Sequence, residues 1–149
     1  MSASDAADEV VECKQALLRG EISAVQTYDQ VIEKMGDTAK APDLRKMREE
    51  HVRARDTISR HVEMSGEPPE EGSGAWGAWA RLTAGTAKIF GETAAMKALK
   101  EGEEHGLKSY ERAIENVPLD AAFRTEVESR LMPAQRTHIA RLDQLMDQQ

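Results

Sequence analysis

The chain has 149 residues, 40% of them hydrophobic and 32% charged, and a net charge of −7 at pH 7. This length suits one domain with a buried core, so we predict a single domain over residues 1–149. The negative charge argues against nucleic acid as a partner, because the two polyanions would repel each other. No apolar run approaches the roughly 20 residues that a membrane helix needs, so a membrane-embedded protein is not expected.

Only 4% of the residues are aromatic, while Ala, Leu, Met, Glu, Lys, Arg and Gln are abundant. These residues favour helix over strand, so the composition predicts an all-α fold. Cys13 is the only cysteine, so no internal disulfide can form. The N-terminal sequence has neither the basic start nor the apolar core of a secretory signal, and the expected location is the cytoplasm.

The first half of the chain predicts two long helices. One runs from about Asp5 to Met35, where Gly36 stops it, and the other from near Pro42 to residues 65–66. Apolar residues recur at helical spacing on one face of each, namely Leu17, Val25, Tyr28, Ile32 and Met35, then Leu44, Met47, Ala54, Ile58 and Val62.

The middle of the chain predicts a long connection rather than a tight turn. Residues 66–74 read GEPPEEGSG, and their prolines and glycines prevent a regular helix. The following stretch contains Trp76 and Trp79 and is predicted to form one or two short helices that cover the bundle or a dimer contact. Residues 66–92 together form a central crossover, which is typical of one class of four-helix bundle.

The second half predicts two more helices. The third runs from about Thr93 to Asn116, and the fourth opens at Pro118 and Asp120 and continues to the C-terminus. Pro133 lies inside the fourth helix and is predicted to kink or locally break it. Their inner faces are predicted to contain Leu99, Leu107, Ile114 and Val117, then Val127, Leu131, Leu142 and Leu145.

Two segments of the chain resemble each other. Residues 14–33 read KQALLRGEISAVQTYDQVIE and residues 96–115 read MKALKEGEEHGLKSYERAIE, with seven of twenty aligned positions identical at a constant offset of 82. The similarity pairs Glu21 with Glu103 and Tyr28 with Tyr110. Helices that each carry one inward carboxylate are typical of four-helix carboxylate bundles.

A polar layer is predicted where the inner faces meet, formed by Glu21, Tyr28, His51, Glu103, Tyr110 and His138. In di-iron bundles, each helix that supplies a His also supplies a Glu three positions earlier. Here those positions hold Arg48 and Gln135. Arg cannot ligate a metal and Gln balances no charge, so a di-iron site is disfavoured.

Two hypotheses remain for this layer. In the favoured one, no cofactor binds, and Arg48 points inward and pairs with Glu21 or Glu103. In the alternative, Arg48 points to solvent and one Fe, Zn or Mn ion is held by Glu21, His51, Glu103 and His138. A register shifted by one residue would offer other ligands, which are otherwise expected on a solvated face: Glu49, Glu50, Glu104 and His105.

Several stretches together carry a family resemblance: GEP at 66–68, GSGAWG at 72–77, KEGEEHGLKSYERAI at 100–114 and QRTH at 135–138. From about Val10 to Leu145 the chain resembles the ferritin-like family known as domain of unknown function DUF2383. The resemblance implies a ferritin-like four-helix bundle with a long central crossover and a bacterial origin. It implies no activity, because that family has no settled one.

A broader resemblance to rubrerythrins and ferritins covers Glu21, His51, Glu103 and His138 and fails at the two positions occupied by Arg48 and Gln135. The predicted function is therefore a non-catalytic or stress-associated binding bundle with a degenerate metal site. The alternative is a metal-dependent oxidoreductase of the rubrerythrin or ferritin type with a mononuclear or atypical site. A homo-oligomer is expected, a dimer above all, and the sequence identifies no small-molecule ligand.

Overall fold

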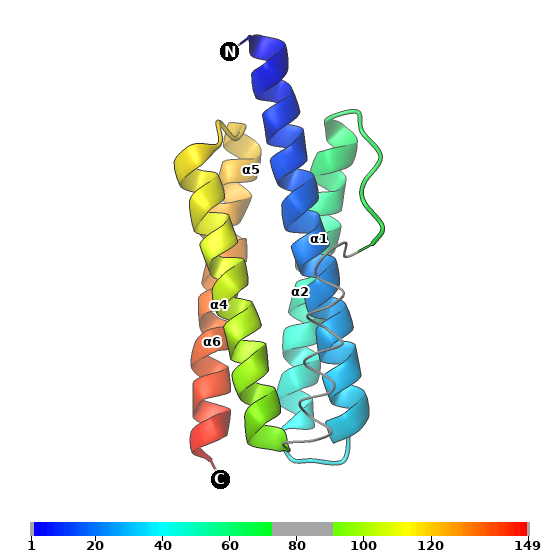
Figure 1. The fold of residues 1–149 in the computed structure, drawn as a ribbon, viewed down its shortest axis with the longest axis vertical. Helices are drawn as coiled ribbons and strands as arrows, with labels where there is room; N and C mark the ends of the chain where they lie inside the picture. Colours follow the sequence, from blue (N-terminus) through cyan, green and yellow to red (C-terminus); the bar gives the residue numbers. More distant parts are fainter. Residues whose placement is uncertain (1, 73–90, 149) are drawn as a thin grey trace.

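Within the described residues, the helices form four long segments, and these lie side by side (Figure 1). The computed structural model describes residues 2–72 and 91–148, and within them every regular element is a helix. The elements are α1 (Ala3–Met35), α2 (Ala41–Met64), α4 (Glu92–Asn116), α5 (Ala121–Glu126), the π-helix η2 (Val127–Leu131) and α6 (Met132–Asp147). The predicted all-α bundle is confirmed.

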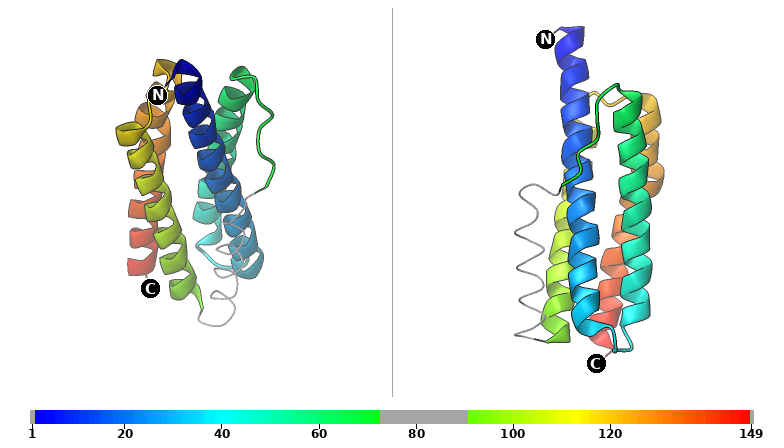
Figure 2. Two further views of the ribbon diagram at one scale, coloured as in Figure 1. Left: turned by 45° about the horizontal axis from the view of Figure 1, so that its top comes forward. Right: turned by 90° about the vertical axis from the view of Figure 1, so that its right-hand side faces the viewer.

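The helices form two antiparallel pairs. α1 packs mainly on α2, and α4 packs mainly on α6. α2 ends near the end of the bundle where the chain starts, whereas α4 begins at the opposite end (Figures 1 and 2). α2 and α4 therefore run parallel, as a long central connection requires. The short helices predicted around Trp76 and Trp79 lie outside the described residues.

The helix starts follow from local chemistry. α1 begins earlier than predicted because Ser2 and Asp5 form a capping box: each side chain accepts a hydrogen bond from the other's backbone N–H. α2 carries Pro42 in its first turn, where a missing N–H costs nothing. Asp120 caps α5 by accepting from the backbone N–H of Phe123 at 3.2 Å.

The fourth segment departs from α geometry where Pro133 predicts it. Residues 127–131 form a π-turn, in which the backbone N–H of Met132 donates to the carbonyl of Val127. The π-helix ends at Leu131, and Pro133 lies in the first turn of α6, where its missing N–H is tolerated. Gln135 and His138 of α6 are both buried in the core.

The apolar core is divided into two clusters. One contains Leu17, Leu18, Ile22, Ile58, Val62, Tyr110, Ala113, Leu119, Phe123, Val127, Leu131 and Met132. The other contains Tyr28, Val31, Met35, Leu44, Met47, Ala95, Met96, Leu99, Leu142 and Leu145. The buried polar residues Glu21, His51, Glu103 and His138 belong to neither cluster. Along their helices, His51, Glu103 and His138 lie between residues of the two clusters, whereas Glu21 lies beside Ile22 of the first.

A buried lysine ties three helical segments together near the start of α5. Lys14 of α1 is 4% exposed, and its Nζ lies 2.8 Å from Asp120 and 3.4 Å from the hydroxyl of Ser65 at the end of α2. The ammonium also lies 5.2 Å from the centre of the Phe123 ring.

No helix within residues 2–72 and 91–148 is both long enough and apolar enough to cross a bilayer. The expected homo-oligomer, the single domain and the cytoplasmic location stay predictions.

Candidate metal centre

Four helices each bring one ionisable side chain to the middle of the bundle. Glu21 of α1, His51 of α2, Glu103 of α4 and His138 of α6 are each less than 5% exposed. Each lies on the apolar face of its helix, so packing of the neighbouring apolar residues carries it inward. These four side chains are therefore buried inside the bundle.

His51 lies at the centre of the layer, between the two glutamates. Its Nδ1 is 2.7 Å from Oε2 of Glu21 and its Nε2 is 2.6 Å from Oε1 of Glu103. A carboxylate that is ionised can only accept hydrogen bonds, so between two such carboxylates both ring nitrogens donate and the ring is an imidazolium. Burial opposes that charge, but Glu103 and Glu21 outweigh it and raise the pKa of His51 well above its ordinary value.

The two tyrosines pair reciprocally with the two glutamates. Tyr28 of α1 donates to Oε1 of Glu103 of α4 at 2.8 Å, and Tyr110 of α4 donates to Oε1 of Glu21 of α1 at 2.6 Å. Burial, together with the adjacent carboxylate, raises the pKa of each phenol well above its ordinary value, so both are neutral donors. Each of the two similar segments thus completes the hydrogen bonds of the other.

His138 is held more loosely than His51. Its Nδ1 lies 3.3 Å from both carboxylate oxygens of Glu103, and its Nε2 lies 3.4 Å from Oε1 of Glu50. The two imidazole rings are 4.9 Å apart between centroids. Burial disfavours ionisation of Glu103, but the two histidines outweigh it and lower its pKa far below the ordinary range.

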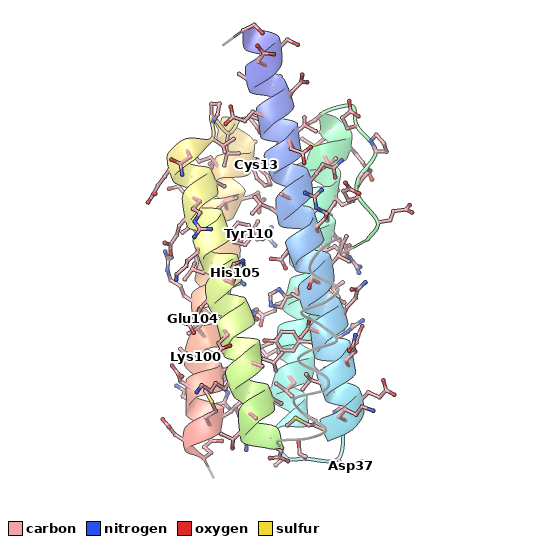
Figure 3. All side chains as sticks on the ribbon, in the orientation of Figure 1. Cys13, Asp37, Lys100, Glu104, His105 and Tyr110 are labelled. Carbon is pink, nitrogen blue, oxygen red and sulfur yellow. The ribbon has the colours of Figure 1, made fainter. Side chains whose placement is uncertain are left out.

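Glu50 is a member of the layer that the sequence argument did not select. It was expected on a solvated face, yet its carboxylate is only 27% exposed and approaches His138. The other neighbours considered with it do lie outside: Glu49, Glu104 and His105 are exposed (Figure 3 labels the last two on α4). The signal that could have revealed Glu50 is its position directly before His51, on the side of α2 that faces α6.

Arg48 does not enter the layer, and the prediction that it pairs with Glu21 or Glu103 is wrong. Its guanidinium binds Asp29 of α1 and Glu49 near the surface, with Nη1 2.6 Å from Glu49. The physical reason is that a long side chain can pass along the helix surface and leave its charge in water. Two exposed carboxylates partner it there at lower desolvation cost than a buried site.

Gln135 is buried, as predicted, and packs directly on the backbone of α4. A Cβ added at Gly106 would come within 2.5 Å of Nε2 of Gln135. The glycine therefore allows the amide to approach the helix closely. Gln135 occupies this space beside Glu103 and His138 without adding charge.

Three side chains converge well enough to hold one ion. One donor atom from each of His51, Glu103 and His138 can be chosen so that all lie within 4.8 Å of one another. Glu21 is bonded to the opposite nitrogen of His51 and stays outside this group. With Arg48 outside and Glu50 inside, the layer has three carboxylates, which is fewer than the four that neutralise a pair of divalent ions in di-iron bundles. The donor set fits a single ion.

Comparison with known proteins assigns the chain to a family. The model of the family described as Domain of unknown function (DUF2383) matches residues 9–116, so the chain belongs to that family. The match contains Glu21, His51 and Glu103 and ends with α4, so His138 lies beyond it. No curated protein and no solved structure matches the chain.

Proposed function

We propose that this member of the DUF2383 family binds one divalent transition-metal ion in the middle of the bundle, through His51, Glu103 and His138. The observation that carries the proposal is the convergence of these three donors within 4.8 Å. Two imidazoles and one carboxylate suit Fe(II), and also Zn or Mn. The outward position of Arg48 removes the fixed positive charge that would have opposed a cation there.

The surrounding hydrogen bonds support the same proposal. Glu21 accepts from Nδ1 of His51, while Nε2 of the same ring points to Glu103. A carboxylate behind a ligating imidazole is the usual arrangement at metal sites, since it fixes the ring and makes it more basic. Tyr28 similarly holds one oxygen of Glu103. Binding requires the proton on Nε2 of His51 to leave.

Three protein ligands leave coordination positions open, as they do in catalytic rather than structural sites. A metal ion with open positions supplies Lewis-acid or redox chemistry to a molecule bound beside it. The residues of this chain would hold the ion and determine the net charge of the site, and their burial keeps bulk water away. This supports a metal-dependent oxidoreductase more than the non-catalytic bundle that the sequence favoured.

One observation favours the second function, a metal-free binding bundle. The layer closes its hydrogen bonds without an ion: His51 bridges two carboxylates and each tyrosine donates to one of them. Paired buried charges of this kind can fix the register of helices without adding stability.

The test is metal binding by protein purified without a His-tag and stripped with a chelator. Titration with Co(II) and Zn(II) against a competing chelator should give about one ion per chain, as three converging donors imply. His138→Ala should abolish tight binding, while the matched variant His105→Ala, on the exposed side of α4, should bind as the wild type does. A wild-type protein that binds neither ion would support the metal-free bundle.

A further inference from the structure

A cavity adjoins the candidate metal centre on the side of α2 and α6. Its volume is about 240 Å³, and both histidines of the centre, His51 and His138, line it. A water molecule has a share of about 30 Å³ in the liquid, so the cavity has room for several waters or one small molecule. A second hollow, between α1 and α4, is only about 60 Å³ and touches His51 and Glu103 but not His138.

The wall of the larger cavity carries two cations from different helical segments. Arg53 lies on the face of α2 that also presents Glu50, Ala54 and Thr57, and Arg130 is the fourth residue of η2. Within the described part of the chain, Arg130 has one ion pair, a 3.3 Å contact with Glu126 in which the arginine side chain is 58% exposed. Exposed pairs of this type contribute little, about 0–1 kcal/mol, so the guanidinium can turn to another partner.

The carboxylates in the same wall are already engaged. Glu21 accepts hydrogen bonds from Tyr110 and His51, and Glu50 lies against His138. Glu21 and Glu50 would repel an anion, but the two guanidinium groups match their two negative charges and a bound divalent ion would add further positive charge. The planar guanidinium group presents paired N–H donors that match the oxygens of carboxylates and related anions. A cavity that held only water would not require two such groups in its wall.

We propose that this cavity admits a small monovalent anion, either a short carboxylate or an inorganic anion, which occupies an open coordination position of the metal. Arg53 and Arg130 balance its charge at the cavity wall. The inference rests on the proposed metal site and specifies the class of molecule that reaches it. The volume excludes large substrates, and the direction of entry is the gap between α2 and the segment η2–α6.

The test uses full-length protein loaded with Co(II), whose visible spectrum reports its ligands. Azide and acetate are titrated separately, which distinguishes an inorganic anion from a carboxylate. At least one of them should change the spectrum and saturate. In the double variant Arg53→Gln, Arg130→Gln, the apparent Kd of that anion should rise roughly tenfold, because two partly screened positive charges are lost.

A matched control separates the cavity from general surface charge. Arg45→Gln, Arg136→Gln makes the same charge change on α2 and α6 with two exposed residues that do not line the cavity. It should leave the Kd of the anion unchanged within about twofold, since exposed charges outside the cavity are screened by salt. Equal weakening in both double variants would overturn the inference.

The remaining outcomes also separate the two proposals. Co(II) binding without any response to azide or acetate overturns the anion cavity and leaves the metal site standing. Failure to bind Co(II) at all overturns both. The Co(II) affinity of each variant is measured in the same series, so loss of the ion is not mistaken for loss of the anion, and circular dichroism confirms that each variant is folded.

Discussion

His51 decides what the polar layer can do, because it hydrogen-bonds to both central glutamates. With both nitrogens protonated it donates one hydrogen bond to Glu21 and one to Glu103. With Nε2 deprotonated it becomes a metal ligand that Glu21 still orients from behind. The same geometry thus serves two exclusive states, which differ by the exchange of one proton for one metal ion.

Glu103 is the only carboxylate in the group of converging donors, so its loss should affect metal binding most. Glu103→Gln keeps the size of the side chain and removes its charge. We expect Zn(II) affinity to fall by more than about 100-fold, beyond the usual effect of a residue behind a ligand. Glu104→Gln, its exposed neighbour, should bind normally in the same chelator competition, and similar losses in both variants would contradict the assignment.

Glu21 was predicted as a ligand, but its contact with Nδ1 of His51 assigns it a supporting position. Glu21→Gln should therefore weaken Zn(II) binding by about 10–100-fold, less than Glu103→Gln does. Both variants are compared at one pH with the same competing chelator. If the two losses were equal, Glu21 would be a direct ligand, as the sequence argument supposed.

At this scale the sequence identifies residue types and faces but not the direction of long side chains. Glu21, His51, Glu103 and His138 interrupt apolar stripes, and such interruptions are visible in one dimension. Arg48 and Glu50 lie two positions apart. Arg48 was predicted to point inward and Glu50 to lie on a solvated face, but Arg48 turns to the surface and Glu50 approaches His138. Which of two flanking side chains turns inward depends on surface partners such as Asp29, and no periodicity contains that information.

Among the helical elements, the boundaries were predictable where a local signal marks them. Gly36, Pro42 and Asp120 lie close to predicted ends or starts, since each acts through its own backbone or capping chemistry. The π-turn is different. Pro133 predicts that the α-helix is interrupted nearby. Whether the interruption is a kink, a break or a π-turn depends on how the preceding turn packs, which the sequence does not specify.

Asp120 has two structural tasks, and two substitutions separate them. Asp120→Asn keeps an N-cap acceptor but leaves the buried ammonium of Lys14 without its anion, which should cost about 1–3 kcal/mol of the free energy of unfolding. Asp120→Ala should cost about 1 kcal/mol more, because the cap is lost as well. Urea unfolding measures both, with Asp8→Asn on the exposed part of α1 as the control.

The decisive result is the stability of Asp120→Asn relative to the wild type. An Asp120→Asn variant as stable as the wild type would show that Lys14 finds sufficient compensation from Ser65 and the Phe123 ring.

For the molecule as a whole, stability should depend on acid through this ion pair. Partial burial opposes ionisation of Asp120, but the bonds from Lys14 and from the backbone of Phe123 outweigh it and lower the pKa of Asp120 below 3.8. A lowered folded-state pKa stabilises the fold above about pH 4, and the contribution is lost as the pH falls through that folded value. The free-energy gap between wild type and Asp120→Asn should therefore shrink from pH 6 to pH 3. A gap independent of pH would refute this.

Metal binding should also stabilise the whole bundle, because the donors come from three helices and converge only in the folded chain. At a free Zn(II) concentration 100 times the Kd, the gain should be about 2.7 kcal/mol. It appears as a higher Tm in Zn(II) than in chelator, and Mg(II) at the same concentration should have no such effect, since it prefers oxygen ligands. An unchanged Tm in Zn(II) argues for the metal-free bundle.

The crossed tyrosine–glutamate pairs make the two helical hairpins dependent on each other. Tyr28 of α1 donates to Glu103 of α4, and Tyr110 of α4 donates to Glu21 of α1, so two reciprocal hydrogen bonds join these helices. A shift of one helix by one turn, about 5.4 Å, would break both hydrogen bonds and leave Glu21 and Glu103 buried without their tyrosine donors. The layer therefore fixes the register of the two helical hairpins at one alignment and disfavours alignments shifted by a turn, whether or not an ion lies between them.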